Sequence, residues 1–282
     1  MSSGSLLTVE RRHVVGAAAF VAVAFCVLYL PVVIRLVRDW ATDDNYSHGF
    51  LVVPIAAYLA WERREAVRAA GVRPSMWGAA VVAGSLALLV AGVLGAELFL
   101  TRMSVVGVTA GMVLWLLGWR ALRALQFPVA FLMLMIPIPA ILFNQIAFPL
   151  QLLASRFGTA VMSMASVPVL REGNVLVLSN TTLEVAEACS GIRSLVSLLT
   201  FGILLGYFTE SRATMRIATA LATIPIAIVA NGLRVAGTGV AAYYYGAGAA
   251  EGFLHTFAGW LVFVASLALL AASQRAMRWS VR

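Results

Sequence analysis

Long runs of apolar residues recur along the whole chain and are separated by short polar stretches. A helix needs about 20 mainly apolar residues to cross the hydrocarbon core of a bilayer. The pattern therefore predicts an all-α integral membrane protein with about eight transmembrane helices. In chain order, the expected spans are residues 14–34, 49–61, 76–94, 103–117, 125–143, 189–208, 213–235 and 254–272. The second span is short, the fifth is broken by Pro137 and Pro139, and the seventh is expected to continue further.

One segment, residues 144–188, departs from this pattern. Its first part, 144–164, has the polar spacing of an amphipathic helix that lies at the membrane interface or re-enters the bilayer. The next part has two strand-forming runs around Glu172-Gly173-Asn174, which predict a β-hairpin, and a second turn signal at Ser179-Asn180. Because such backbone is costly in lipid, we expect a small extracytoplasmic cap before the sixth span. Residues 1–282 otherwise form one polytopic membrane domain.

Composition and charge strengthen the membrane assignment and give it an orientation. Charged residues make up only 11% of the chain, against about 25% in a typical soluble domain. The net charge of +8 rests on 20 arginines in short loops, so we expect no nucleic-acid partner. With a cytoplasmic N-terminus, 13 of the 20 arginines fall on the inner side, as the positive-inside rule requires. An even number of spans then returns the C-terminus to the cytoplasm, and we expect a multi-pass protein of the cytoplasmic membrane.

Three residues that could perform chemistry fall at the outer face in this orientation. Cys189 opens the sixth span, Arg234 lies at the outer end of the seventh, and His255 begins the eighth. A helix N-terminus and a nearby cation both favour the nucleophilic thiolate over the thiol. His255 could take the thiol proton and return it to a leaving amine, whereas Arg234 stays protonated and could stabilise the thiolate or an oxyanion. The three side chains could therefore carry out thiol-based peptide processing at the outer face.

Each of these residues also has a simpler interpretation. A single cysteine in a helical membrane protein is commonly a packing residue, as we expect for Cys26 in the first apolar run. Arg234 can extend its guanidinium to the interface, and His255 can bond to backbone there. Arg193, about one helical turn after the cysteine of the sixth span, competes with Arg234 for the role of cation. The Glu187 carboxylate would oppose thiolate formation if it points inward.

The outer start of the second span carries a fourth group of polar residues. Asp43, Asp44 and His48 are metal-ligand types, but no other ligand cluster accompanies them, so we expect no metal site and no cofactor. Ser47 fits the N-cap of the following helix. His48 shares the predicted outer face with Cys189 and is a candidate for lining the same site.

Taken together, these motifs resemble those of the exosortases, a family of bacterial membrane proteins with archaeal relatives called archaeosortases. Either of the two main motifs alone would be a modest signal, but Glu-Ala-Cys-Ser-Gly followed by Asn-Gly-Leu-Arg is specific. The resemblance covers most of the chain, from about residue 40 to residue 255. The matching motifs are Tyr-Ser-His-Gly at 46–49 with its apolar run ending at Pro54, Pro-Ile-Pro at 137–139, Glu-Ala-Cys-Ser-Gly-Ile-Arg at 187–193, Asn-Gly-Leu-Arg at 231–234, and the segment around His255.

The resemblance implies a membrane-embedded cysteine transpeptidase or protease. In that reading Cys189 is the nucleophile, Arg234 the electrostatic stabiliser and His255 the general acid and base. Five further residues would support the site or contact the substrate: His48, Glu187, Ser190, Arg193 and Asn231.

The resemblance also implies the substrates. They would be membrane-anchored exported proteins that end in a Pro-Glu-Pro-type motif, a transmembrane helix and a basic tail. Cleavage near the motif would form a thioester, and the new carboxyl end would pass to a lipid-linked or polysaccharide acceptor, in keeping with exopolysaccharide biosynthesis. One alternative is a transporter or scaffold subunit of an exopolysaccharide export system, which would need a polar path across the bundle. A second is a peptidase without acceptor transfer.

Overall fold

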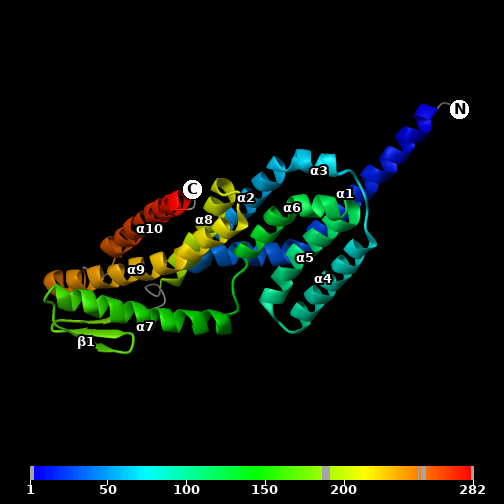
Figure 1. Ribbon diagram of the computed structural model, residues 1–282. Helices are drawn as coiled ribbons and strands as arrows, with labels where there is room; N and C mark the ends of the chain where they lie inside the picture. Colours follow the sequence, from blue (N-terminus) through cyan, green and yellow to red (C-terminus); the bar gives the residue numbers. More distant parts are fainter. Residues whose placement is uncertain (1–2, 186–190, 247, 249–251, 281–282) are drawn as a thin grey trace. The chain divides into compact units, whose positions relative to one another are not determined.

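The computed structural model describes residues 3–185, 191–246, 248 and 252–280, and it is mostly α-helical (Figure 1). The chain divides into two compact units, Met1–Pro137 and Ile138–Arg282. They are called the N-terminal unit and the C-terminal unit. The organisation as one membrane domain stays a prediction.

The N-terminal unit consists of helices. Its helices α4 (Met76–Leu94) and α5 (Leu98–Leu116) form a closely packed antiparallel hairpin. A Cβ added at Gly78 would lie only 2.1 Å from the backbone nitrogen of Trp115. The elements are α1 (Ser3–Thr42), η1 (Asp44–Tyr46), α2 (Gly49–Glu62), α3 (Arg64–Ala70), α4 (Met76–Leu94), α5 (Leu98–Leu116), α6 (Trp119–Phe131) and η2 (Leu132–Met135).

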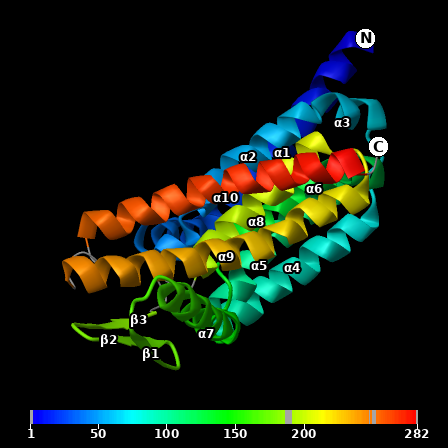
Figure 2. The same ribbon diagram turned by 60° about the vertical axis from the view of Figure 1, so that its left-hand side comes forward.

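The described part of the C-terminal unit combines four helices with a small antiparallel sheet in the order β1-β2-β3. The sheet lies beside α7 in Figure 2. The predicted hairpin is confirmed, with Glu172 paired to Val175 across its turn. The third strand was not predicted. The elements are α7 (Ala140–Met164), β1 (Val169–Glu172), β2 (Val175–Leu178), β3 (Thr182–Glu184), α8 (Ile192–Thr209), α9 (Ala213–Tyr245) and α10 (Gly252–Ser280).

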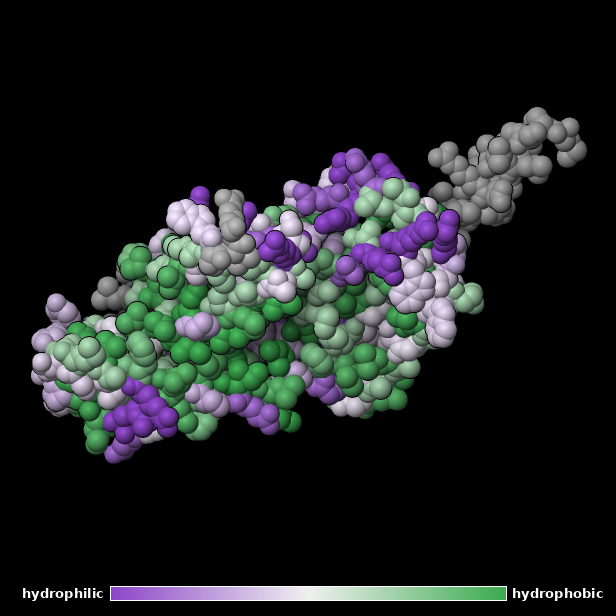
Figure 3. All heavy atoms as spheres, in the orientation of Figure 1, coloured by the Kyte–Doolittle hydropathy of each residue, from purple (hydrophilic) through white to green (hydrophobic). Residues whose placement is uncertain are grey.

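Five helices among the described residues are long and apolar enough to cross a membrane: α4, α5, α8, α9 and residues Phe257–Trp279 of α10. The count rises to six if the bent pair Trp119–Met135 and Ala140–Met164 forms one span. These six correspond to the third to eighth predicted spans. Apolar side chains cover much of the helical surface in Figure 3, whereas hydrophilic ones gather over α3. Such a surface is expected where lipid rather than water surrounds the helices.

The fifth predicted span, residues 125–143, is interrupted as its prolines suggested. Helix α6 ends at Phe131, η2 follows, and α7 begins only at Ala140. Proline lacks the backbone N–H that a helix interior needs and disfavours helical conformation in the residue before it. Pro137 and Pro139 therefore end one helix and precede the next. The amphipathic helix expected from residue 144 accordingly starts four residues earlier.

Contacts through small residues hold α7 against α9 in the C-terminal unit. A Cβ at Gly158 would lie 2.7 Å from Val235, and one at Gly232 would lie 2.4 Å from Phe157. The sheet joins the same core, because Leu176 is fully buried with residues of α7 and α9. This packing fixes α9, and it is α9 that carries the Asn-Gly-Leu-Arg motif.

Candidate functional site

Gly191 sets the start of α8 directly against α9. It is the N-cap of α8 and has a left-handed backbone, with φ of +78°. A Cβ at this position would lie 2.7 Å from Cγ of Asn231. Both the backbone conformation and the close approach require glycine. The last residue of the Glu-Ala-Cys-Ser-Gly motif, Gly191, therefore lies against the side chain of Asn231. Gly191 follows Cys189 by two residues in the sequence.

A second glycine brings α10 to the same helix. A Cβ at Gly259 would lie 3.1 Å from Nη2 of Arg234 and 3.2 Å from its Cζ. The guanidinium of Arg234 thus lies across the backbone of α10. His255 precedes Gly259 by one helical turn on that helix. The structure therefore brings the Asn-Gly-Leu-Arg motif against the helix that carries the predicted acid and base.

Asn231 and Arg234 share one face of α9, because residues three apart on a helix are neighbours. Asn231 is 5% exposed and Arg234 is half-buried. A cavity of about 10 Å³, room for roughly one water molecule, lies beside Asn231 and Gly191 and reaches Leu195 of α8. One face of α9 therefore contacts both the beginning of α8 and the first turns of α10.

Several predicted site residues are not described in atomic detail. Glu187, Cys189 and Ser190 lie outside the described residues, and so does the side chain of His255. Their catalytic and supporting roles stay predictions. The described contacts nearest to them in the sequence are those of Gly191 with Asn231 and of Gly259 with Arg234.

The position of Arg193 differs from the sequence-based reasoning. The sixth span was expected to start near Cys189, which would place Arg193 one helical turn later on the same helix. Helix α8 begins at Ile192, because the left-handed Gly191 caps it. Arg193 is therefore the second residue of α8, and Cys189 lies outside the described residues. Arg193 is half-buried in the first turn of α8, where the helix dipole disfavours a cation.

His48 lies in the N-terminal unit, where its ring binds backbone. The side chain is 7% exposed, and its Nε2 lies 3.0 Å from the carbonyl oxygen of Leu134. Burial lowers the pKa of His48 below its ordinary value. The indole N–H of Trp40 donates to the next carbonyl, of Met135, at 2.9 Å. Two side chains thus hold the last carbonyls of η2, just before the proline break.

Ser47 and Asp43 make local hydrogen bonds in this region. Ser47 is not the N-cap of α2, which has His48 at that position, and its hydroxyl donates to the carbonyl of Asp44 instead. Asp43 accepts from the backbone N–H of Asn45 and so caps η1. Within the described part of the chain, no three His, Cys, Asp or Glu side chains gather in an arrangement that could hold a metal ion.

The sequence of this chain matches one known family. Residues 40–272 match the transmembrane exosortase family, and this range contains every candidate site residue named above. The chain has no match among curated proteins or solved structures. The sequence named Asn231 and Arg234 as candidate site residues, but it did not show that Gly259 lies against the guanidinium of Arg234. Gly259 follows His255 by four residues, so the sequence alone could have placed the two on the same face of a helix.

Proposed function

Since this chain belongs to the transmembrane exosortase family, we propose that it is a cysteine transpeptidase acting on C-terminal sorting signals of exported proteins. The observation that carries the proposal is the pair of glycine contacts on α9. Gly191 sits against Asn231, and Gly259 sits against Arg234. These contacts join the three motifs through one helix face, as an active site assembled from three segments requires.

The proposed reaction begins with attack of the Cys189 thiolate on the carbonyl carbon of the scissile bond. The C=O electron pair moves to oxygen, and the guanidinium of Arg234 stabilises that oxyanion. The C–N bond then breaks as the imidazolium of His255 protonates the leaving amine, which leaves a thioester on Cys189. An amine or hydroxyl of the acceptor attacks the thioester and passes its proton to His255. The thiolate leaves, and the enzyme returns to its starting state.

The substrates in this proposal are membrane-anchored proteins with a Pro-Glu-Pro-type motif, a transmembrane helix and a basic tail. Their scissile bond would lie just outside the bilayer, at the depth proposed for Arg234 of α9 and the beginning of α10. The acceptor would be lipid-linked or a polysaccharide. Glu187, Ser190, Arg193 and Asn231 would support the site or contact the signal, and the family resemblance makes His48 a further candidate for this role.

The proposed topology has eight spans in the cytoplasmic membrane. It adds α1 and α2 to the five apolar helices and the bent pair. Both chain ends would be cytoplasmic. The fifth span would be residues 125–143 of the bent pair, and residues 144–188, with the rest of α7 and the sheet, would form an extracytoplasmic cap. The distribution of arginines between the two sides supports this orientation.

The direct test replaces Cys189 with Ala in the host and follows a tagged protein that ends in motif, helix and arginine-rich tail. We expect the full-length substrate to accumulate with Cys189→Ala, whereas the control Cys26→Ala should process it at the normal rate. Unchanged processing with Cys189→Ala would contradict the proposal. It would favour a transport or scaffold role instead.

A further inference from the structure

The N-terminal unit contains a cavity of about 390 Å³ between α1, α4 and α5. Its volume lies within the range of about 300–1,000 Å³ that is common for small-molecule sites. Two arginines line it, Arg35 from α1 and Arg102 from α5. Paired guanidinium groups in a membrane protein are unusual, because charges near lipid are costly and commonly mark a binding or transport site.

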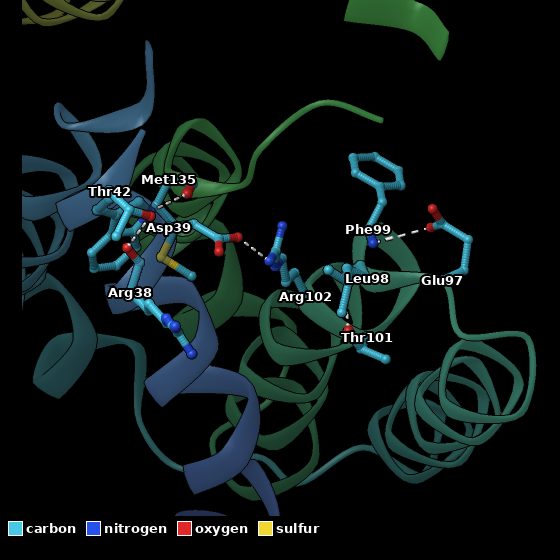
Figure 4. A network of polar contacts seen from close by, with 10 residues as sticks. Arg38, Asp39, Thr42, Glu97, Leu98, Phe99, Thr101, Arg102 and Met135 are labelled. Carbon is cyan, nitrogen blue, oxygen red and sulfur yellow. Dashed lines mark hydrogen bonds and ion pairs between the residues drawn. The ribbon is translucent and has the colours of Figure 1, made fainter. Parts of the chain in front are cut away.

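Arg102 is held in place by an ion pair within the protein. The side chain of Arg102 is 4% exposed, and its guanidinium pairs with the carboxylate of Asp39 on α1 (Figure 4). Removing one partner of a buried pair is strongly destabilising, because it leaves an uncompensated charge. Asp39 therefore neutralises Arg102 and fixes one wall of the cavity. The net charge of the cavity then depends on the other arginine, Arg35.

Arg35 supplies that net positive charge. It precedes Asp39 by one turn of α1, so the two side chains share a face of the helix. Arg35 is exposed, and among the described residues no carboxylate pairs with it. Arg38 lies on the same helix and is also exposed, but it does not line the cavity, and in Figure 4 it extends away from the Asp39–Arg102 pair. The cavity is therefore cationic through Arg35.

The rest of the lining is apolar and partly open to the exterior. Val93 at the end of α4 is 64% exposed, and Leu98 at the start of α5 is 41% exposed. Pro31 of α1, one turn before Arg35, is exposed as well. On a helix that crosses a membrane, such side chains face hydrocarbon. A ligand that fills this cavity therefore needs an anionic group for Arg35 and an apolar part for the remaining wall.

We propose that this cavity binds one membrane phospholipid with an anionic head group. The phosphate would accept charge-assisted hydrogen bonds from Arg35, with Arg102 as a second donor, and an acyl chain would cover Val93 and Leu98. Guanidinium groups suit phosphate oxygens because their planar donors match them in pairs. Basic pockets between transmembrane helices bind lipid head groups in this way. A free anion would leave the apolar wall uncovered, so the lipid is the better occupant.

The test uses the full-length protein, purified in a neutral detergent and stripped of native lipid. Native mass spectrometry would follow the titration with phosphatidylglycerol, with diacylglycerol and with inorganic phosphate. We expect one phosphatidylglycerol to bind, and neither diacylglycerol nor phosphate alone to bind at the same concentrations. Saturation by inorganic phosphate, or equal binding of diacylglycerol, would overturn the proposal.

A matched pair of variants tests the assignment of Arg35. Arg35→Gln and Arg38→Gln remove the same charge from neighbouring positions of one helix, and both side chains are exposed. Because Arg35→Gln removes the charge-assisted hydrogen bonds to the phosphate, we expect it to weaken phosphatidylglycerol binding about tenfold or more and Arg38→Gln to leave it near the wild-type value. An equal loss in both variants would indicate unspecific attraction and overturn the proposal. None of these residues takes part in the proposed catalytic site, so the two proposals can fail separately.

Discussion

At residue 191 the chain has no alternative to glycine. The left-handed φ of +78° is costly for any residue with a Cβ, and the space that a Cβ would need is filled by Asn231. The sequence predicted a functional motif at this place because of Cys189, not because of the glycine. The structure adds that Gly191 is the position where the cysteine segment contacts α9.

Gly191→Ala is therefore expected to disturb the site more than a typical surface change. Overpacking commonly costs about 1–3 kcal/mol, and here it would push Asn231 away from α8. We expect substrate processing to fall at least about tenfold, since each 1.36 kcal/mol in a barrier is tenfold in rate. Gly237→Ala on α9 is the control, because a Cβ there meets nothing within 4 Å. Normal processing by Gly191→Ala would show that the contact does not position the site.

His48 gives a pH dependence whose sign follows from its burial. Its pKa in the folded protein is lowered from the ordinary value of 6.5, so the unfolded chain takes up a proton first as the pH falls. The unfolded state binds more protons in that window, and stability decreases as the pH drops below about 6.5. We expect a lower thermal midpoint at pH 5 than at pH 7.5. His48→Gln should reduce this difference, and an unchanged difference would contradict the account.

Among the elements, the most regular ones were the most predictable. The third predicted span coincides with α4, because its apolar run is continuous and uncharged. The hairpin turn was predicted from Gly173, whose φ is +66°. The start of α8 was missed, since it depends on the contact of Gly191 with Asn231, which is distant in sequence. The strand β3 was missed although it pairs with the neighbouring β2, and the turn before it also makes contacts distant in sequence. Asn180, for example, donates to the carbonyl of Ala242 on α9, and no local pattern shows such a contact.

The break after η2 shows why the predicted fifth span could not be placed accurately. The prolines indicated a break, but they did not show which groups take the carbonyls of Leu134 and Met135. The structure assigns these to His48 and Trp40. Gly49 belongs to the same arrangement, because a Cβ there would lie 2.3 Å from the indole nitrogen of Trp40. The Tyr-Ser-His-Gly motif thus has a described structural role, whereas its part in catalysis stays a proposal.

Trp40→Phe tests that role, because it keeps an aromatic ring and removes the indole N–H. The carbonyl of Met135 would lose its buried donor, which commonly costs about 1–3 kcal/mol. We expect a lower thermal midpoint for Trp40→Phe in detergent. Trp77→Phe is the matched control, since Trp77 lies in the same unit and is 71% exposed. Equal midpoints for the two variants would mean that the hydrogen bond contributes little.

At the scale of the whole molecule, composition was enough to predict the class. A chain that is 62% hydrophobic exposes apolar side chains widely, as Figure 3 shows, and the membrane accounts for that surface. The match to the transmembrane exosortase family over residues 40–272 confirms the resemblance that the motifs had indicated. The number of spans was less predictable, because α2 is short and the bent pair α6–η2 and α7 can count as one span.

The proposed orientation of the whole molecule can be tested on Cys189. In a Cys26→Ala background it is the one remaining thiol of the chain. We expect a membrane-impermeant maleimide to label it in intact spheroplasts, because the proposed topology places it on the outer face. Labelling that requires permeabilised membranes would reverse the orientation.

The central claim is that Cys189 forms a thioester with the cleaved substrate, and capture of that intermediate tests it most directly. Purified protein would be mixed with a peptide that carries the sorting motif, quenched in acid and analysed by intact mass spectrometry. The account predicts a mass increase equal to the N-terminal fragment of the peptide, lost on treatment with hydroxylamine. The adduct should form in the wild type and in Cys26→Ala and be missing in Cys189→Ala. An adduct that persists in Cys189→Ala would contradict the account.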